Sequence, residues 1–372
     1  MRFPEFSGKW KKVRLGEECN MLCGYAFNGE DIVEQGSYLL MRGINITEGS
    51  IRHSSELDRY YSGSIEKLDK YKLAVGDLVI GMDGSKVGRN SAIVSSYEDG
   101  SYLVQRVCRI KSSIGNNYIL QFINNTKFHQ YVDTVKTSSA IPHISLRDIQ
   151  NYRISIPPTQ NETDKIAKLF LLIDERIATQ NKIIEKYESL IRGIRNESFR
   201  KLRRNVGFNA MIGDVLGYEQ PQSYIVEDTE YTDEGTPVLT ANKAFVLGYT
   251  SETAGIYDKG DCIIFDDFTL DCKYVDFPFK VKSSAIKILT AENKELLRYT
   301  FEFLKYLDLS TDEHKRHYIA ETQNQEFILP TTQIVRTISH AFSVLSLRME
   351  TVVKQRLLFE KQKQYLLRQM FI

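Results

Sequence analysis

Residues 156–199 read IPPTQNETDKIAKLFLLIDERIATQNKIIEKYESLIRGIRNESF, and residues 328–371 read ILPTTQIVRTISHAFSVLSLRMETVVKQRLLFEKQKQYLLRQMF. The two segments align without a gap, and ten of the 44 aligned positions are identical. Unrelated sequences of ordinary composition match at about one position in fifteen. Each copy follows a segment of different sequence, so the chain consists of two tandem copies of one unit. We therefore divide it into residues 1–155, 156–204, 205–328 and 329–372.

Both repeated segments are predicted to be long helices. Pro158 lies where a helix begins, and Thr159 and Glu162 have the spacing of a capping box, in which each side chain satisfies a backbone N–H of the first turn. Apolar residues then recur at the a and d positions of a heptad. The residues expected to pair helix with helix are Ile166, Phe170, Ile173, Ile177 and Ile184 in the first copy and Ile338, Phe342, Leu345 and Met349 in the second.

The second copy departs from the heptad. Arg356 and Lys363 occupy positions where an apolar residue is expected. The stripe is therefore expected to drift around the helix, to Leu357, Leu358, Leu366 and Leu367. Since neither stripe is stable in water, two arrangements remain open. The helices pair antiparallel within one chain, in a pseudo-twofold arrangement, or they form a helical hairpin or a zipper between two chains. The gapless repetition favours the antiparallel pair.

The two blocks that precede the helices are predicted to be small β-rich domains, which makes the fold class α+β. KLAVGDLVIGMDG (72–84) in the first block corresponds to IYDKGDCIIFDDF (256–268) in the second, each with a Gly-Asp turn before an apolar strand. Residues 91–110 resemble a hairpin that turns at Glu98-Asp99-Gly100. Residues 117–132 and 294–307 have apolar residues at helical spacing.

Composition and charge restrict the class of protein. Hydrophobic residues make up 42% of the chain and charged residues 26%, as in an ordinary folded protein. The five cysteines form no C-x-x-C pair, so we expect reduced thiols and a cytoplasmic location, and no apolar run is long enough to span a membrane. The four segments carry net charges of +3, +4, −11 and +5 in chain order. The helices are therefore basic, whereas the second block is acidic.

The sequence lacks the motifs of an enzyme. It has no P-loop, no Asn/Asp-Pro-Pro-aromatic loop of an amino-methyltransferase and only chance-level nuclease patterns. His314 and His317 are weak candidates for a metal site, so we expect no metal, no resident cofactor and no catalytic residue. Polar and basic residues at turns and strand ends are instead typical of base and phosphate contacts. The candidates are Arg42, Asn45, Lys86, Arg89, Gln105 and Arg106 in the first block and Asn242, Lys243, Lys273, Lys280 and Lys282 in the second.

Several segments of the sequence, in their order along the chain, resemble segments of one known protein family. They are GDLVIGMDGSKVG and PHISLRDIQNYRISIPP in the first half, with TPVLTANKAFVLGY, CIIFDDFTLD and DFPFKVKSSAIKIL in the second. With the two helix segments, they make the chain similar to the specificity subunit of type I restriction–modification systems, which act in DNA methylation and phage defence. The resemblance implies that residues 1–155 and 205–328 are target-recognition domains, each reading one half of a bipartite site in double-stranded DNA.

The resemblance also implies partners. The helices would be spacers that fix the gap between the half-sites and dock two modification (methyltransferase) subunits, through which restriction subunits join. S-adenosylmethionine, ATP and Mg would bind to those partners only. One feature departs from this expectation, because the charge of −11 in residues 205–328 does not suit a surface that faces phosphates. A non-catalytic protein scaffold with degenerate recognition domains is therefore the alternative.

Overall fold

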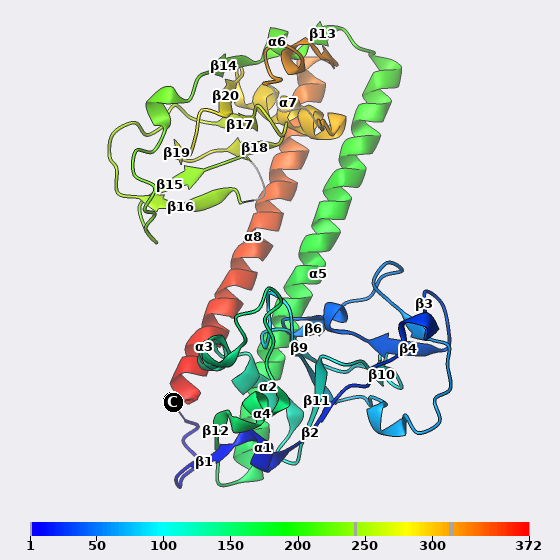
Figure 1. Ribbon diagram of the computed structural model, residues 1–372. Helices are drawn as coiled ribbons and strands as arrows, with labels where there is room; N and C mark the ends of the chain where they lie inside the picture. The colour runs from blue at the N-terminus through cyan, green and yellow to red at the C-terminus, as the bar shows by residue number, and fades with distance from the viewer. Residues whose placement is uncertain (1, 242–243, 312–315, 372) are drawn as a thin grey trace. The chain divides into compact units, whose positions relative to one another are not determined.

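The computed structural model describes residues 2–241, 244–311 and 316–371 (Figure 1). The chain separates into two compact units. Unit 1 comprises Met1–Thr179 and Arg356–Ile372, and unit 2 comprises Gln180–Gln355. The long helices α5 (Gln160–Asn205) and α8 (Thr332–Met370) each contribute to both units. The α+β class with long helices is thereby confirmed, while the predicted boundaries at residues 155, 204 and 328 stay predictions.

Unit 1 contains two four-stranded sheets, in the orders β2-β11-β8-β9 and β10-β4-β7-β3, and the two-stranded pairs β1-β12 and β5-β6. The strands are β1 (Lys11–Arg14), β2 (Cys19–Cys23), β3 (Ile32–Val33), β4 (Tyr38–Met41), β5 (Ile46–Thr47), β6 (Ser50–Ile51), β7 (Tyr60–Tyr61), β8 (Leu78–Gly81), β9 (Ser91–Ile93), β10 (Tyr102–Leu103), β11 (Val107–Ser112) and β12 (Arg153–Ile156). The short helices are α1 (Leu15–Glu18), α2 (Asn116–Ile123), α3 (Thr126–Val135) and α4 (Leu146–Asn151).

Unit 2 repeats this plan. Its sheets run β14-β20-β17-β18 and β16-β15-β19, with the pair β13-β21. In both units the second of these sheets contains one parallel pair, β10 with β4 in unit 1 and β15 with β19 in unit 2. The elements are β13 (Ala210–Met211), α6 (Ile212–Val215), β14 (Gly217–Glu219), β15 (Thr236–Leu239), β16 (Val246–Thr250), β17 (Cys262–Asp266), β18 (Cys272–Val275), β19 (Lys280–Val281), β20 (Ile286–Thr290), α7 (Lys294–Leu307) and β21 (Glu326–Phe327).

The two Gly-Asp turns are equivalent in structure as well as in sequence. Gly76 precedes β8 with a φ of 87°, and Gly260 precedes β17 with a φ of 96°. A side chain at either position would strain this left-handed backbone, so glycine is favoured there. Each turn starts a strand of four or five consecutive buried residues, because β8 and β17 lie inside their sheets.

Two local predictions in the first block need correction. Residues 91–110 do not form a hairpin, because β9 and β11 pair with opposite sides of β8 and the intervening β10 pairs with β4 in the other sheet. The predicted helix 117–132 is two helices, α2 and α3. The break falls at Asn125, whose side chain accepts a hydrogen bond from the N–H of Lys127 and caps α3.

At the start of α5, one of the two hydrogen bonds of the predicted capping box is present. The hydroxyl of Thr159 accepts a hydrogen bond from the N–H of Glu162 at 3.4 Å. The carboxylate of Glu162 is fully buried and has a different role, since it accepts hydrogen bonds from Nε and Nη2 of Arg2, both at 2.6 Å, and from Nε1 of Trp10 at 3.2 Å. This two-pronged, charge-assisted contact attaches the N-terminal segment to the first turn of α5.

Within each unit, a part of α5 packs antiparallel against a part of α8. In unit 1, Asp174 accepts a hydrogen bond from Lys363 at 2.6 Å, and the guanidinium of Arg176 lies over the ring of Phe359. In unit 2, Arg195 lies over the ring of Phe342. The nine residues predicted to pair the helices are all buried or half-buried.

The predicted drift of the stripe on α8 is wrong at Leu357 and Leu358, whereas Leu366 is half-buried and Leu367 is buried, as the prediction requires. Arg356 and Lys363 are half-buried and keep the stripe on one face, whereas Leu357 and Leu358 are exposed. The ion pair between Lys363 and Asp174 explains how a cation is accommodated at an apolar position.

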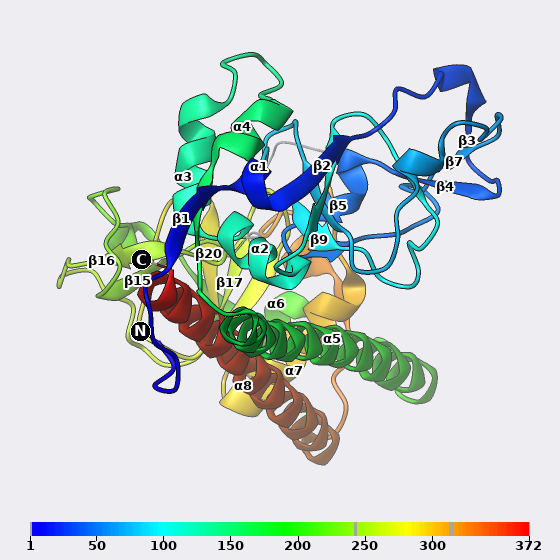
Figure 2. The same ribbon diagram turned by 90° about the horizontal axis from the view of Figure 1, so that it is seen from below.

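An aromatic side chain at the end of each repeat closes a core. Phe199 packs against Tyr299, Phe303 and Tyr306 in unit 2. Its counterpart Phe371 packs in unit 1 against Trp10, Tyr118, Phe122 and Phe170. The N-terminal segment and the end of α8 accordingly lie close together (Figure 2).

We expect Phe371→Ala to lower the free energy of unfolding of unit 1 by about 3–5 kcal/mol, because it leaves a cavity in an aromatic core. Trp10 is the only tryptophan and lies 6.4 Å from the Phe371 ring, so its fluorescence during urea denaturation reports on this unit. Tyr365→Ala, at a position that is 53% exposed, is the control and should change the free energy by less than about 0.5 kcal/mol. Equal transitions for the two variants would contradict this packing role.

Candidate functional site

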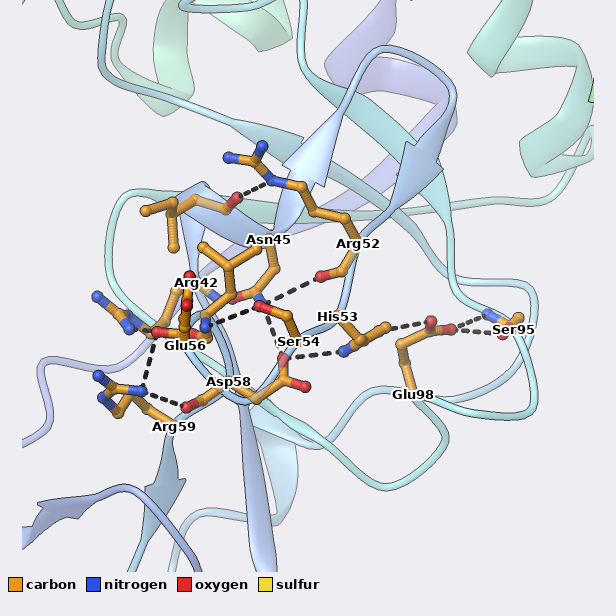
Figure 3. A network of polar contacts seen from close by, with 12 residues as sticks. Arg42, Asn45, Arg52, His53, Ser54, Glu56, Asp58, Arg59, Ser95 and Glu98 are labelled. Atoms are coloured by element: carbon orange, nitrogen blue, oxygen red, sulfur yellow. Dashed lines mark hydrogen bonds and ion pairs between the residues drawn. The ribbon is translucent and has the colours of Figure 1, made fainter. Parts of the chain in front are cut away.

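A polar network organises the segment 42–59 of unit 1 (Figure 3). Asn45 is buried at its centre. Its amide oxygen accepts a hydrogen bond from the N–H of Arg42 at 3.3 Å, and its Nδ2 donates to the carbonyl of Arg52 at 3.3 Å and to the Asp58 carboxylate at 3.0 Å. The amide oxygen and Nδ2 of its side chain thus both form hydrogen bonds inside the protein. Asn45 therefore shapes the segment and is not placed to contact a ligand.

His53 joins this network to a second loop. Its Nδ1 lies 2.9 Å from Asp58, and its Nε2 lies 3.0 Å from Glu98, whose carboxylate also accepts from the N–H and hydroxyl of Ser95 at 2.7 and 2.6 Å. Burial acts to raise the pKa of Glu98, but the hydrogen bonds from Ser95 and His53 outweigh it and hold the pKa below its usual value. The exposed ring of Tyr97 lies 4.4 Å from the imidazole.

Three arginines project from this framework. Backbone carbonyls hold each guanidinium: Leu57 holds Arg42 at 3.4 Å, Ile44 holds Arg52 at 3.0 Å, and Asp58 and Glu56 hold Arg59 at 2.7 and 3.1 Å. Arg59 also lies 3.7 Å from the Glu34 carboxylate. A guanidinium has five N–H donors in a planar fork, so each keeps further donors for a ligand. Anchoring by the main chain reduces the side-chain entropy that binding would otherwise cost.

A hollow of about 560 Å³ adjoins the network, and its lining is polar and aromatic. It is formed by Glu34, Gln35, Gly36, His53, Ser54, Ser55, Asp58, Tyr60 and Tyr97. The Nδ1 and Nε2 atoms of His53 are already occupied by carboxylates. The imidazole is thus a structural bridge between two loops in this arrangement.

The other predicted contacts of unit 1 lie on two turns. Lys86 is exposed beside Glu48 at 3.3 Å, and Arg89 forms an ion pair with Asp133 of α3 at 2.9 Å. Gln105 and Arg106 are both exposed in the turn between β10 and β11. Arg106 has a φ of 69°, an uncommon value for a residue with a side chain, and such strain concentrates at functional positions.

Unit 2 offers a smaller set of predicted contacts. Lys273 is half-buried on β18, and Lys282 is exposed just after β19. Lys280 is buried and bound to Glu252 at 2.6 Å and to the carbonyl of Ala254 at 2.7 Å, so it is a structural residue. The predicted contacts Asn242 and Lys243 lie outside the described residues.

Much of the positive charge of unit 2 is neutralised internally. Lys287 lies 3.5 Å from Asp267, with both side chains fully buried. Glu302, equally buried, binds Arg195 at 2.8 Å and Arg298 at 2.9 Å. A series of exposed acids occupies the loop between Val226 and β15, namely Glu227, Asp228, Glu230, Asp233 and Glu234. Most of the described Lys and Arg side chains in residues 205–328 therefore already form an ion pair with an acid.

Sequence reasoning missed His53, Asp58, Glu98, Arg52 and Arg59. His53 and Glu98 are 45 positions apart, and no spacing rule connects them. The density of polar residues in SIRHSSELDR (50–59) was the available signal, because such a stretch between short strands predicts a loop. In the described ranges, no cluster of three or more His, Cys, Asp or Glu has metal-binding geometry, and no helix is long and apolar enough to cross a membrane.

The chain is similar in sequence to proteins of one known family. Residues 7–189 match a family model described as the type I restriction modification DNA specificity domain. The chain is 46% identical over 126 residues to the type I restriction enzyme EcoR124I/EcoR124II specificity subunit of Escherichia coli, and 30% identical over 179 residues to the type I restriction enzyme EcoAI specificity subunit of the same species. These matches cover 32% and 47% of this chain and only 31% and 29% of the relatives.

A solved structure matches over the whole fold. It is the S subunit of a type I restriction–modification system from M. genitalium, with a TM-score of 0.67 and 15% identity, and the match covers 100% of this chain and 99% of that one. At this identity the likeness concerns the fold.

We expect Glu98→Gln to lower the free energy of unfolding of unit 1 by about 1–3 kcal/mol near pH 7, because charge-assisted bonds from Ser95 and His53 are weakened. The pKa of Glu98 is lower in the folded protein, so this stabilisation is present above its unfolded value of about 4.3 and is lost as the pH falls through the folded value.

Urea denaturation followed by Trp10 fluorescence at pH 7 and near pH 3 measures this difference. Glu48→Gln removes an exposed carboxylate from the same unit and serves as the control, with a change of less than about 0.5 kcal/mol. A deficit of Glu98→Gln that persisted unchanged in acid would contradict the role given to the carboxylate.

Proposed function

We propose that this chain, which belongs to the family of type I restriction–modification specificity subunits, recognises a bipartite site in double-stranded DNA through its two units. The observation that carries the proposal is the repeated plan of the units, in which the sheets recur in the same order and an aromatic residue of the repeated segment closes each core. Two related but unequal modules in one chain suit a target made of two unequal halves.

Unit 1 would read its half-site with the anchored arginines and the neighbouring turn. A guanidinium can bond to O6 and N7 of guanine, and Gln can bond in the same two-pronged way to adenine. Arg42, Arg52 and Arg59 come from the framework around Asn45, while Gln105 and Arg106 come from the turn before β11. The framework would orient the side chains, since Asn45 itself is buried.

Unit 2 would contribute less to the attraction for phosphates. Lys273 and Lys282 are its remaining candidates, and its exposed acidic loop repels a phosphate backbone. We propose that this unit binds DNA within the assembled complex, where basic partner surfaces supply phosphate contacts. The same acidity is what supports the alternative, a scaffold in which one recognition domain binds only protein.

Replacing residues 1–155 with the corresponding block of another specificity subunit should change one half of the methylated target and leave the other half unchanged. The reason is that each module contacts its own half-site. Methylation-aware sequencing of DNA from cells that carry the complete system measures both halves together. A change in both halves of the target would contradict modular reading. A target that stays the same after the replacement would favour the alternative of a protein scaffold.

We further propose that the helices dock two modification subunits, one on each unit. Large apolar side chains are exposed on the outer faces of the helices although the stripe between them is covered. They are Leu171, Leu172, Leu357, Leu358 and Tyr365 in unit 1 and Leu190, Ile334, Val344 and Leu347 in unit 2. Exposed apolar groups that recur on both units are typical of interaction surfaces.

Leu358→Asp should remove one modification subunit from the complex, and Leu347→Asp should remove the other. These side chains are 65% and 63% exposed, so neither change should affect folding by more than about 0.5 kcal/mol. Native mass spectrometry of the co-expressed subunits gives the stoichiometry. Gln362→Asp, at an exposed polar position of α8, is the matched control. Full complexes with both leucine variants would contradict docking on these faces.

The chemistry would belong to the partners. We propose that S-adenosylmethionine, ATP and Mg act on the modification and restriction subunits and that this chain supplies recognition alone. Incubating the purified chain with DNA and a labelled methyl donor should give no incorporation, while the same chain with its modification subunits should label the target. Methyl transfer by the chain alone would contradict this division.

A further inference from the structure

Two cysteines of unit 1 lie opposite each other on neighbouring strands. Cys23 is the last residue of β2, and its register partner on β11 is Cys108. The N–H of Gly24 donates to the carbonyl of Val107 at 2.9 Å, which makes Cys23 and Cys108 a non-hydrogen-bonded pair of the antiparallel ladder. In such a pair the Cα atoms are about 4.5 Å apart and the side chains share one face, within the range that a disulfide spans.

The two sulfurs differ in environment in a way that suits oxidation. Cys23 is half-buried, and a hydrogen bond from the Cys108 thiol lowers the pKa of Cys23 to about 7. The same hydrogen bond, together with complete burial, raises the pKa of Cys108 well above its usual value. Cys23 also lies 3.7 Å from the sulfur of Met82. A partly accessible thiolate beside a second thiol is the arrangement found in redox-sensing cysteines.

The remaining cysteines provide an internal contrast. Cys19 lies on the same strand but faces Ser112, and burial raises the pKa of Cys19 to about 11. Burial likewise raises the pKa of Cys262 to about 12 and of Cys272 to about 11 in unit 2. All five thiols are free in the structure. Reactivity is thus concentrated at the Cys23–Cys108 pair.

The pair lies at the base of the turn that carries Gln105 and Arg106. This turn is held to the end of β2 by hydrogen bonds from the N–H of Tyr25 to Leu103 at 2.9 Å and from the N–H of Gln105 to Tyr25 at 2.8 Å. Its other end is held by the N–H of Met82, which donates to the carbonyl of Arg106 at 2.8 Å. The backbone at Gly24 approaches Val104 so closely that a Cβ there would lie 2.1 Å from the carbonyl oxygen. A displacement of the Cys23–Cys108 pair would therefore also displace the turn that carries Gln105 and Arg106.

We propose that Cys23 and Cys108 form an oxidation site, at which a peroxide converts the two thiols into a cross-strand disulfide, and that this disulfide displaces Gln105 and Arg106 and weakens reading of the first half-site. The effect on DNA rests on the proposed function, whereas the disulfide does not.

One molecule of hydrogen peroxide is sufficient to oxidise the two thiols to a disulfide. The thiolate of Cys23 attacks one oxygen, the O–O bond breaks, hydroxide leaves, and Cys23 becomes a sulfenic acid. The leaving hydroxide takes the proton of Cys108, whose sulfur then attacks the sulfur of Cys23. The S–S bond forms as the S–O bond breaks, and the second oxygen leaves as water after taking up a proton from solvent. Two thiols are oxidised and one hydrogen peroxide is reduced to two waters, and a thiol reductant reverses the disulfide.

Peptide mapping tests the site. The purified full chain is treated with hydrogen peroxide, alkylated, digested and analysed by mass spectrometry. We expect a cross-link between the peptides that contain Cys23 and Cys108, and its loss after reduction. Cys108→Ala should leave Cys23 as a sulfenic acid that a 1,3-dione probe traps, whereas Cys19→Ser should leave the cross-link unchanged. Cys23→Ala gives a second test if Cys108→Ala fails to fold. Thiols that stay reduced, or a cross-link to another cysteine, would overturn the proposal.

Binding to DNA tests the consequence. The complex with its modification subunits is titrated with target DNA before and after peroxide treatment. We expect affinity to fall roughly tenfold, the effect of losing about one base contact, and to recover with reductant. The Cys108→Ala complex should not respond. A disulfide that forms without any change in affinity would overturn the regulatory role. Absence of specific binding in both redox states would instead count against the proposed function, while the peptide map still decides the disulfide.

Discussion

The apolar stripes of two helices, of 46 and 39 residues, must be covered, and the organisation of the chain follows from this requirement. A stripe of that length cannot be buried by the small sheet domain that precedes it. Each unit meets the requirement with helix segments from both copies of the repeat, so that the beginning of α5 packs with the end of α8 in unit 1 and the reverse holds in unit 2. Where the stripe is polar, as at Lys363, an ion pair with Asp174 replaces the missing apolar contact.

What could be predicted from the sequence was local or periodic. The helices and their paired faces follow from heptad spacing, and the equivalence of the two blocks follows from the repeated Gly-Asp turns at Gly76 and Gly260. The order of strands was not accessible, because β8 takes the place between β9 and β11 through contacts distant in sequence. The side chains that position the candidate site were missed for the same reason, since His53 and Glu98 meet only after two loops have folded together.

The charge of −11 in residues 205–328 has a structural explanation that composition does not reveal. The buried acids do not contribute to the excess, because bases neutralise them, as Lys287 does for Asp267 and as Arg195 and Arg298 do for Glu302. A buried carboxylate whose partner is removed costs several kcal/mol, so these acids and bases depend on one another. Five of the acids that make up the excess lie in the exposed loop between Val226 and β15. Net charge was therefore a poor measure of the surface that faces a ligand.

The discontinuity of unit 1 has a consequence for the order in which the protein can fold during synthesis. Unit 2 is one continuous stretch, Gln180–Gln355, whereas unit 1 needs the side chain of Phe371 between Trp10 and Phe170. At ribosomal rates of about 5–20 residues per second, the segment that begins at Arg356 appears roughly ten to forty seconds after Thr179. For that interval the first block would remain open along the face that α8 later covers. The first module to be made is thus the last to be completed, and nascent chains are expected to need protection there.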